Sequence, residues 1–304
     1  LFLTVTASAA KIDTAGGFCP KKRRDIPGGG VGPRERESRA ETYAPPALGQ
    51  NRQEVKKMSE QVKVTGIVLS VYPIGENDRR LTILTKERGK IQVFARGCRK
   101  PNHPLFGVSQ PLIYCEFMIT EGRRFNYLNS AEGKNYFPHL KEDLEDIYYS
   151  TYFAELAEYF TVEGMDERNI LNLLFVTFTA MEKKKIPLPH IRRIYELKIL
   201  QYYGVGMEVF RCISCGKETE LDTLSLERGG VLCHTCAQGG AYSSTHLDPA
   251  VLYALQYVLS IPLQRLYSFV LKEEVFLEFQ WIVKHFFRIH VEHRFKAGEM
   301  LEEL

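Results

Sequence analysis

The fold is decided first by residues 81–95, which read LTILTKERGKIQVFA. Two runs rich in β-branched and apolar residues flank Lys86-Glu-Arg-Gly89, a sequence typical of a turn, so the stretch predicts a β-hairpin. Successive side chains of a strand point to opposite faces. The second strand therefore has a core face, made by Ile91, Val93 and Ala95, and a basic outer face, made by Lys90, Gln92, Phe94 and Arg96.

Runs of the same kind lie on both sides of this hairpin. They cover residues 62–71, 111–120 and 123–128, with glycine or proline at the breaks. Five short strands without an intervening helix pattern predict a small closed barrel. Residues 58–138 are therefore expected to form an OB-fold nucleic-acid-binding domain, because this barrel type commonly binds nucleic acids at this size.

From residue 139 the apolar spacing becomes helical, with side chains recurring at intervals of three and four residues. The clearest apolar stripes are Tyr149, Phe153, Leu156 and Phe160, then Phe276, Phe279, Val283 and Phe286. One helix is expected to end at Tyr203 and Gly204, and another to begin at Asp248 and Pro249. We therefore expect an α+β multidomain protein in which residues 139–304 form an α-helical domain.

The first 57 residues differ in composition from the rest. They hold 7 Gly and 5 Pro and lack apolar periodicity after their first five positions. Such a segment buries too little apolar surface to offset its ordering entropy, so residues 1–57 are expected to be a disordered tail. The basic run at 21–24 is either a nucleic-acid patch or an ordinary solvated run. Because periodic sequence begins just after Met58, we expect Met58 to be the natural start.

Four cysteines have the spacing of a zinc site. They are Cys212, Cys215, Cys233 and Cys236, two Cys-x2-Cys pairs separated by 17 residues. Four thiolates close the coordination shell of one Zn²⁺ ion, so the predicted site is structural, within a zinc module at about residues 210–240. Two disulfides or four free thiols are the alternatives, and the absence of a secretory segment argues against disulfides.

The composition of the 304 residues excludes several classes of protein. Hydrophobic residues make up 44% and charged residues 25%, as in ordinary globular domains. No stretch reaches the 18 or more apolar residues that a membrane span needs. The net charge of +3 conceals an asymmetry, because residues 58–138 carry 12 basic and 7 acidic side chains whereas residues 139–304 carry 17 and 24. A polyanion is therefore expected to bind the barrel.

The basic residues of the barrel are the candidate DNA contacts, because Lys and Arg neutralise phosphates and aromatic rings stack on bases. The candidate DNA-binding residues are Arg79, Arg80, Lys90, Phe94, Arg96, Arg99, Lys100, Arg123 and Arg124. Each alone has a plainer explanation as a solvated surface charge. Phe125 and Tyr127, which follow, either stack on bases or pack in the barrel.

Catalytic motifs are missing from the chain. It has no Gly-x4-Gly-Lys-Ser/Thr, Gly-x-Ser-x-Gly, His-Glu-x-x-His or Gly-x-Gly-x-x-Gly sequence. We therefore expect that the protein is not an enzyme.

Several motifs occur in a specific order: TGIVL at 65–69, GENDR at 75–79, TKERGK at 85–90, FARGCRK at 94–100, RRIYEL at 192–197 and then the four cysteines. This combination resembles the RecO family of bacterial recombinational repair mediators, in its zinc-bearing branch. The resemblance covers about residues 62–301. The chain departs from the family pattern at Asn102 and His103 and at residues 296–300, and its first 57 residues have no counterpart.

The resemblance implies a DNA repair and recombination mediator without ATPase activity. It implies binding of single- and double-stranded DNA, strand annealing, and loading of RecA onto SSB-coated DNA together with RecR. It also implies that the SSB C-terminal tail docks on the helical domain, where Arg192, Arg193 and Lys198 are candidate contacts; ordinary helix-surface charge is the alternative. The implied location is the bacterial cytoplasm, in association with the nucleoid and without a membrane partner.

One alternative comes from a different functional class. A zinc-stabilised adaptor that contacts only proteins would share the barrel and the cysteines but have no measurable DNA affinity. A metal-dependent enzyme is a further alternative, and four thiolate ligands argue against it because they leave no open position on the metal.

Overall fold

The computed structural model describes residues 60–240 and 243–303. The expectations for residues 1–57, including the disordered tail and the start at Met58, lie outside the described residues. No helix in the described ranges is both long and apolar enough to cross a membrane.

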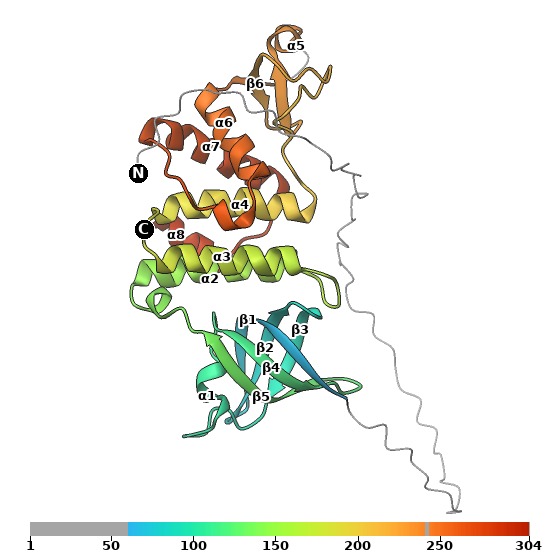
Figure 1. Cartoon of the computed structure of the whole chain (residues 1–304), viewed down its shortest axis with the longest axis vertical. Coiled ribbons are helices and arrows are strands. Elements are labelled where there is room, and N and C mark those ends of the chain that lie inside the picture. Colours follow the sequence, from blue (N-terminus) through green and yellow to red (C-terminus); the bar gives the residue numbers. More distant parts are fainter. Residues whose placement is uncertain (1–59, 241–242, 304) are drawn as a thin grey trace, which may run out of the picture. The chain divides into compact units, whose positions relative to one another are not determined.

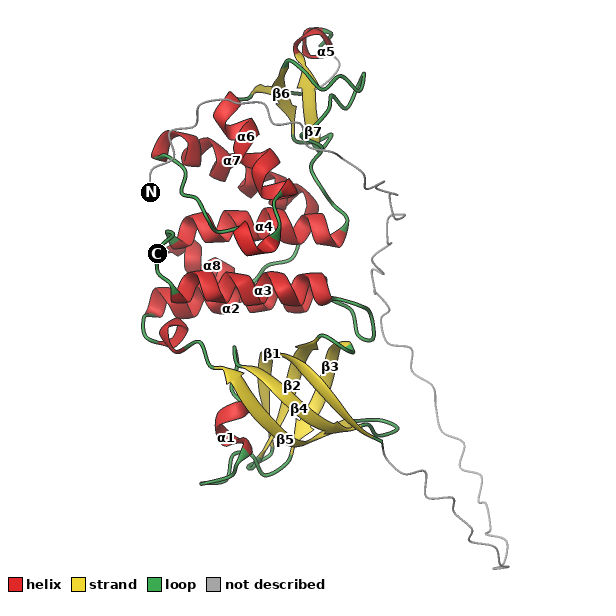
Figure 2. Cartoon of the chain, viewed as in Figure 1, coloured by secondary structure: helices red, strands yellow, loops and turns green. Residues whose placement is uncertain are grey.

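The first part of the described chain is a closed five-stranded β-barrel (Figure 2). Its strands are β1 (Gln61–Ile74), β2 (Asp78–Thr85), β3 (Gly89–Ala95), β4 (Tyr114–Thr120) and β5 (Asn126–Asn135). The barrel order is β1-β2-β3-β5-β4, and β1 also pairs with β4. The barrel closes through a parallel pairing in which Phe94 of β3 lies opposite Tyr127 of β5. This arrangement confirms the predicted OB-like barrel.

The predicted alternation along β3 is confirmed. Val93 and Ala95 are fully buried in the barrel core, and the partly buried Ile91 packs against the same core. The long strand β1 is buried on both faces over its middle part. Val68 belongs to the barrel core, whereas Ile67 and Leu69 belong to a second core formed mainly by helix residues. One side of β1 therefore joins the barrel to the helices.

Two of the predicted strands begin later than expected. The fourth begins at Tyr114 rather than at residue 111, and the fifth at Asn126 rather than at Arg123. The chain turns back on itself before β5 and brings Gly122 so close to Phe125 that a Cβ atom on Gly122 would lie 2.4 Å from the Phe125 carbonyl oxygen. Arg123 and Arg124 therefore lie in the β4–β5 loop and not on a strand.

The rest of the chain is mainly helical (Figure 1). The longer helices are α2 (Leu144–Phe160), α3 (Arg168–Glu182), α4 (Leu188–Tyr203), α6 (Pro249–Ser260), α7 (Glu273–His290) and α8 (Lys296–Glu303). The short ones are α1 (Leu105–Val108), η1 (Pro138–Lys141), α5 (His234–Gln238) and η2 (Leu263–Arg265). The predicted stripe of α7 is buried, so it forms helix core as expected.

The helix termini follow the predicted signals. Helix α4 ends at Gly204, whose φ of 95° is accessible to glycine without strain. Helix α6 begins with Pro249, and the Asp248 side chain accepts a hydrogen bond of 2.7 Å from the Ala250 N–H.

A small sheet is inserted between α4 and α6. Its order is β7-β6-β8, from strands β6 (Leu221–Ser225), β7 (Gly230–Cys233) and β8 (Thr245–His246). All four predicted cysteine ligands lie in or beside this insert, so we call the segment 207–247 the cysteine module.

Candidate nucleic-acid interface and metal centre

Three aromatic rings form a cluster outside the barrel core, where β3 meets β5. The Phe94 ring lies 4.9 Å from the Phe125 ring in an edge-on arrangement and 6.2 Å from the Tyr127 ring. Phe125 is 51% exposed. Tyr127 is half-buried, and neither it nor Phe125 belongs to the barrel core, so both add to the outer face that Phe94 predicts.

Basic side chains lie around this aromatic cluster. The Arg96 guanidinium sits 4.2 Å from the centre of the Tyr127 ring and is exposed. Arg123 and Arg124 are exposed in the loop that leads into Phe125. Exposed rings flanked by cations suit a single strand, because bases stack on the rings while phosphates pair with the cations.

The remaining barrel candidates differ in how free their charges are. Arg79 donates to Ser109 Oγ at 2.7 Å and to the Phe106 carbonyl at 3.2 Å, so it holds β2 to the segment after β3. Arg80 lies 5.2 Å from the ring centre of Tyr72. Arg99 donates to the Gly75 carbonyl at 3.1 Å but stays exposed, as does Lys100 beside it.

Lys90 lies apart from the other candidates. Its Nζ donates to the Glu158 carbonyl oxygen, 2.6 Å away in the last turn of α2. Burial lowers the pKa of Lys90, against the opposite influence of nearby carboxylates, of which Glu158 is the strongest. The Lys90 ammonium group is thus already engaged by the helical part of the protein.

The three candidates for the partner site, Arg192, Arg193 and Lys198, are buried, so the alternative of ordinary helix-surface charge is wrong. Arg192 and Arg193 both pair with the fully buried Glu196, at 3.0 and 2.6 Å. Lys198 donates to the carbonyl oxygens of Val258 and Leu259, at 3.0 and 3.1 Å. Helix α4 is buried on all its sides, and this is why its cations face other helices and not solvent.

A small cavity of about 220 Å³ nevertheless opens beside two of these arginines. Arg192 and Arg193 line it together with Lys284 and with Glu302 of α8. Arg192 also pairs with Glu302 at 2.9 Å. Within the described residues, Arg193 Nε is buried without a hydrogen-bond partner. The cavity is thus lined by three cationic side chains and one carboxylate, and partner binding here stays a prediction.

The sulfur atoms of Cys212, Cys215, Cys233 and Cys236 all lie within 4.8 Å of one another. The Cys215 and Cys233 sulfurs are 3.7 Å apart, close to the roughly 3.8 Å separation of two thiolates at the Zn–S distance of a tetrahedral site. Gly216, at φ 77°, makes the first turn possible, and its N–H donates to the Cys212 carbonyl at 2.8 Å. The residues present therefore fit a metal ion with four sulfur ligands.

The backbone around Cys212 favours the thiolate form that a metal requires. Burial alone raises the pKa of Cys212, but hydrogen bonds from the backbone at Cys233, Cys215 and Ser214 lower it to about 6. The thiolate is thus favoured near neutral pH. His234 is turned to other partners, because its ring nitrogens contact Asp222 and Gln238 at 2.8 and 2.9 Å.

Two exposed aromatic residues of the barrel were missed by the sequence reasoning. Tyr72 and Phe106, each 49% exposed, lie under the guanidinium groups of Arg80 and Arg79. For Tyr72 a signal existed, because it lies directly opposite Arg80 in the β1–β2 register. Phe106 gives no such signal, since it belongs to a one-turn helix within a loop.

Comparisons with known proteins agree on one family. Residues 58–137 match the family described as "Recombination protein O N terminal", and residues 141–299 match "Recombination protein O C terminal". Three similar proteins, each named "DNA repair protein RecO", come from Alkaliphilus metalliredigens, Desulforudis audaxviator and Acetivibrio thermocellus. The first is 30% identical over 76% of this chain and 94% of its own length. The second is 34% identical over 68% and 82%, and the third 26% over 80% and 97%.

Proposed function

The chain belongs to the RecO family, whose members indicate a role in DNA repair, and from this premise we propose that it is a recombinational repair mediator that binds single- and double-stranded DNA through the outer face of its barrel. The observation that carries the proposal is the aromatic cluster of Phe94, Phe125 and Tyr127 with exposed arginines around it. Stacking holds bases without sequence preference, and the cations hold the backbone.

The same contacts explain how the protein would anneal strands. Cations on the barrel neutralise phosphates and reduce the repulsion between two complementary strands. Together with RecR, such a protein would help to load RecA onto DNA coated by SSB. The role needs strand capture and charge screening and no catalytic group, so we assign no enzymatic step. Its place would be the bacterial cytoplasm, at the nucleoid.

The two other predicted sites fit this role as support. The four cysteines hold one structural Zn²⁺ ion, whose contribution is to fix the fold of the cysteine module. The acidic tail of SSB docks at the cavity beside Arg192 and Arg193, where Arg193 Nε has no partner among the described residues. Lys198 is the least accessible of the three, because two backbone carbonyl oxygens already accept from its ammonium group.

The salt dependence of DNA binding tests the proposed interface. Four exposed residues, Arg96, Lys100, Arg123 and Arg124, are replaced together by alanine. Each phosphate neutralised on a single strand contributes about −0.7 to the slope of log K against log salt, so the slope should become shallower by about 3. Fluorescence anisotropy of a labelled oligo-dT, between about 50 and 200 mM salt, measures this slope.

A matched variant removes the same charge elsewhere. Lys183, Lys185, Arg294 and Lys296 are exposed in the helical part, and their replacement by alanine should leave the slope within about 0.5 of the native value. Equal slopes for the native protein and the barrel variant would contradict the proposed DNA interface. Absence of DNA binding by the folded, zinc-loaded native chain would favour the protein-only adaptor.

A further inference from the structure

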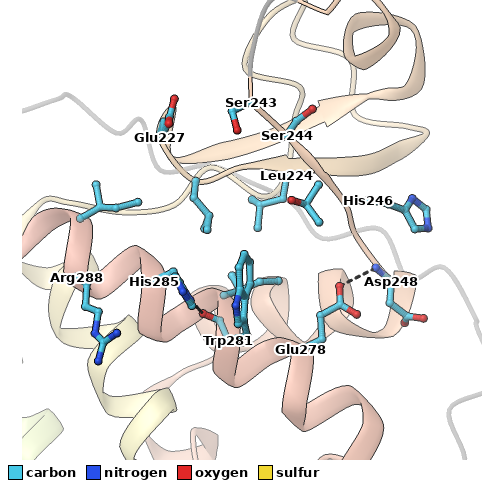
Figure 3. Close-up of a pocket in the computed structure, with 14 residues that line it drawn as sticks. Leu224, Glu227, Ser243, Ser244, His246, Asp248, Glu278, Trp281, His285 and Arg288 are labelled. Carbon is cyan, nitrogen blue, oxygen red and sulfur yellow. Dashed lines mark hydrogen bonds between the residues drawn. The ribbon is translucent and has the colours of Figure 1, made fainter.

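A groove of about 610 Å³ lies between the cysteine module and helix α7 (Figure 3). Leu224 of β6 forms one wall, and Trp281 and Ile289 of α7 form the other. In Figure 3 the Trp281 ring points from α7 toward Leu224. The groove is separate from the barrel face and from the cysteine ligands, so neither proposed role accounts for it.

Helix α7 carries an apolar stripe on its solvent side that runs into this groove. Leu277, Trp281, His285 and Ile289 follow one another at intervals of four residues, which places them in one row. Leu277 is 56% exposed, Trp281 45% and Ile289 47%. The predicted core stripe of the same helix is buried, whereas about half of each of these three apolar side chains stays exposed. Contiguous exposed apolar surface of this kind marks interaction sites.

Carboxylates outnumber cations around the groove. Asp248, Glu278 and Glu227 line it, against the single guanidinium of Arg288. Asp248 accepts from the Ala250 N–H at 2.7 Å and Glu278 from the Asp248 N–H at 3.2 Å (Figure 3). Backbone donors carry no net charge, so these contacts place no cation beside either carboxylate. Arg288 lies 4.0 Å from Glu302, which offsets part of its positive charge.

From these observations we propose that the groove docks a segment of a partner protein in which cationic side chains alternate with apolar ones. A cation of the partner lies over the Trp281 ring and faces Glu278, where the ring and the carboxylate both attract it. Apolar side chains of the segment cover Ile289 and the half-buried Leu226. The acidic rim disfavours a nucleic acid, whose phosphates it repels. The proposal extends beyond DNA binding, because it assigns this face to a protein and leaves the barrel free for DNA.

The chain offers an internal probe for this site. Trp281 is the only tryptophan among the 304 residues, so intrinsic tryptophan emission reports on the groove alone. The full chain, loaded with zinc, is titrated with three eight-residue peptides: alternating Leu and Arg, alternating Leu and Glu, and alternating Ser and Arg. We expect the Leu-Arg peptide to bind saturably and to shift the Trp281 emission to shorter wavelength, as burial of the indole ring does. The other two peptides should bind at least tenfold more weakly.

Two paired variants separate specific docking from general charge attraction. In Glu227→Gln/Glu278→Gln, the new amide oxygen at 278 still accepts from the Asp248 N–H, and binding of the Leu-Arg peptide should weaken by about tenfold. Glu299→Gln/Glu303→Gln makes the same charge change at exposed positions of α8 and should bind like the native chain. Trp281→Phe, followed with a labelled peptide, should bind severalfold more weakly while keeping the native circular dichroism spectrum.

Several results would overturn the proposal. One is an unchanged emission spectrum with the Leu-Arg peptide, and another is equal affinity for the Leu-Arg and Ser-Arg peptides. Tighter binding of the Leu-Glu peptide would assign an acidic partner instead. Quenching of Trp281 by oligo-dT that disappears in Arg288→Ala would show that the groove is a nucleic-acid site.

Discussion

At the scale of single residues, Glu196 is the most deeply buried charged side chain among the described residues. Its carboxylate is fully buried and accepts from Arg192, from Arg193 and from the Tyr152 hydroxyl, the last at 2.8 Å. Burial alone would raise the pKa of Glu196, but the charges of Arg193 and Arg192 and these hydrogen bonds lower it. The carboxylate thus compensates two guanidinium groups that are themselves removed from water.

Replacement of Glu196 by glutamine should therefore destabilise the protein strongly. It removes the carboxylate that both arginines share and leaves Arg192 with Glu302 alone, so we expect the free energy of unfolding at pH 7 to fall by about 3 kcal/mol. Urea unfolding followed by circular dichroism measures the change. The exposed Glu292→Gln variant should change the free energy by less than about 0.5 kcal/mol. A loss of that small size at Glu196 would show that the arginines need no counter-charge.

The stabilisation lost in Glu196→Gln should depend on pH. Because the folded pKa of Glu196 is lowered, its contribution is complete above its unfolded pKa of about 4.3. It is lost as the pH falls through the lower, folded pKa. The difference in unfolding free energy between the native chain and Glu196→Gln should therefore be constant from pH 7 to pH 5 and become smaller in stronger acid. A difference that grows with acidity would contradict this assignment.

At the scale of elements, the sequence predicts types well and edges less well. The five strands, the end of α4 and the start of α6 all follow from local signals. The start of β5 does not follow from such a signal. Arg123, Phe125 and Tyr127 alternate as in a strand although the first two lie before β5, and periodicity alone does not distinguish an extended loop from a strand. The burial of Arg192 and Arg193 escapes prediction for a related reason. A helix enclosed by other helices has no solvent face, and its own sequence does not reveal how many neighbours it has.

The cysteine module is the element in which sequence spacing and geometry agree best. We expect one zinc ion per chain by elemental analysis, and almost none in Cys233→Ser, because three thiolates hold the ion far more weakly. Hydrogen exchange should then accelerate in β6, β7 and α5 and stay unchanged in the barrel, since structural metal sites supply folding energy locally. Cys115→Ala, in the barrel core, is the control that should retain its zinc. A Cys233→Ser chain with full zinc content would exclude the four-sulfur site.

At the scale of the whole described chain, strand β3 contacts the helical part at its start and contributes to the aromatic cluster at its end. At its start, a Cβ atom on Gly89 would lie 2.0 Å from the Met165 carbonyl oxygen, and Lys90 reaches the end of α2. At its end, Phe94 and Arg96 face outward in the aromatic cluster. The sequence shows the alternation along the strand but not this division, because the division depends on where the α2–α3 loop lies. Lys90 and Arg96, equivalent by pattern, are therefore different in role.

This division predicts opposite outcomes for two single substitutions. Arg96→Ala should make the slope of log K against log salt for oligo-dT shallower by about 0.7, the contribution of one phosphate contact. Lys90→Met should leave the slope unchanged, because the native ammonium group donates to the Glu158 carbonyl oxygen. Instead, Lys90→Met should lower the free energy of unfolding by about 1 kcal/mol, because the hydrogen bond to Glu158 is lost. If Lys90→Met flattens the slope as much as Arg96→Ala, then Lys90 leaves α2 to contact DNA, and the barrel and helices separate at this point when DNA binds.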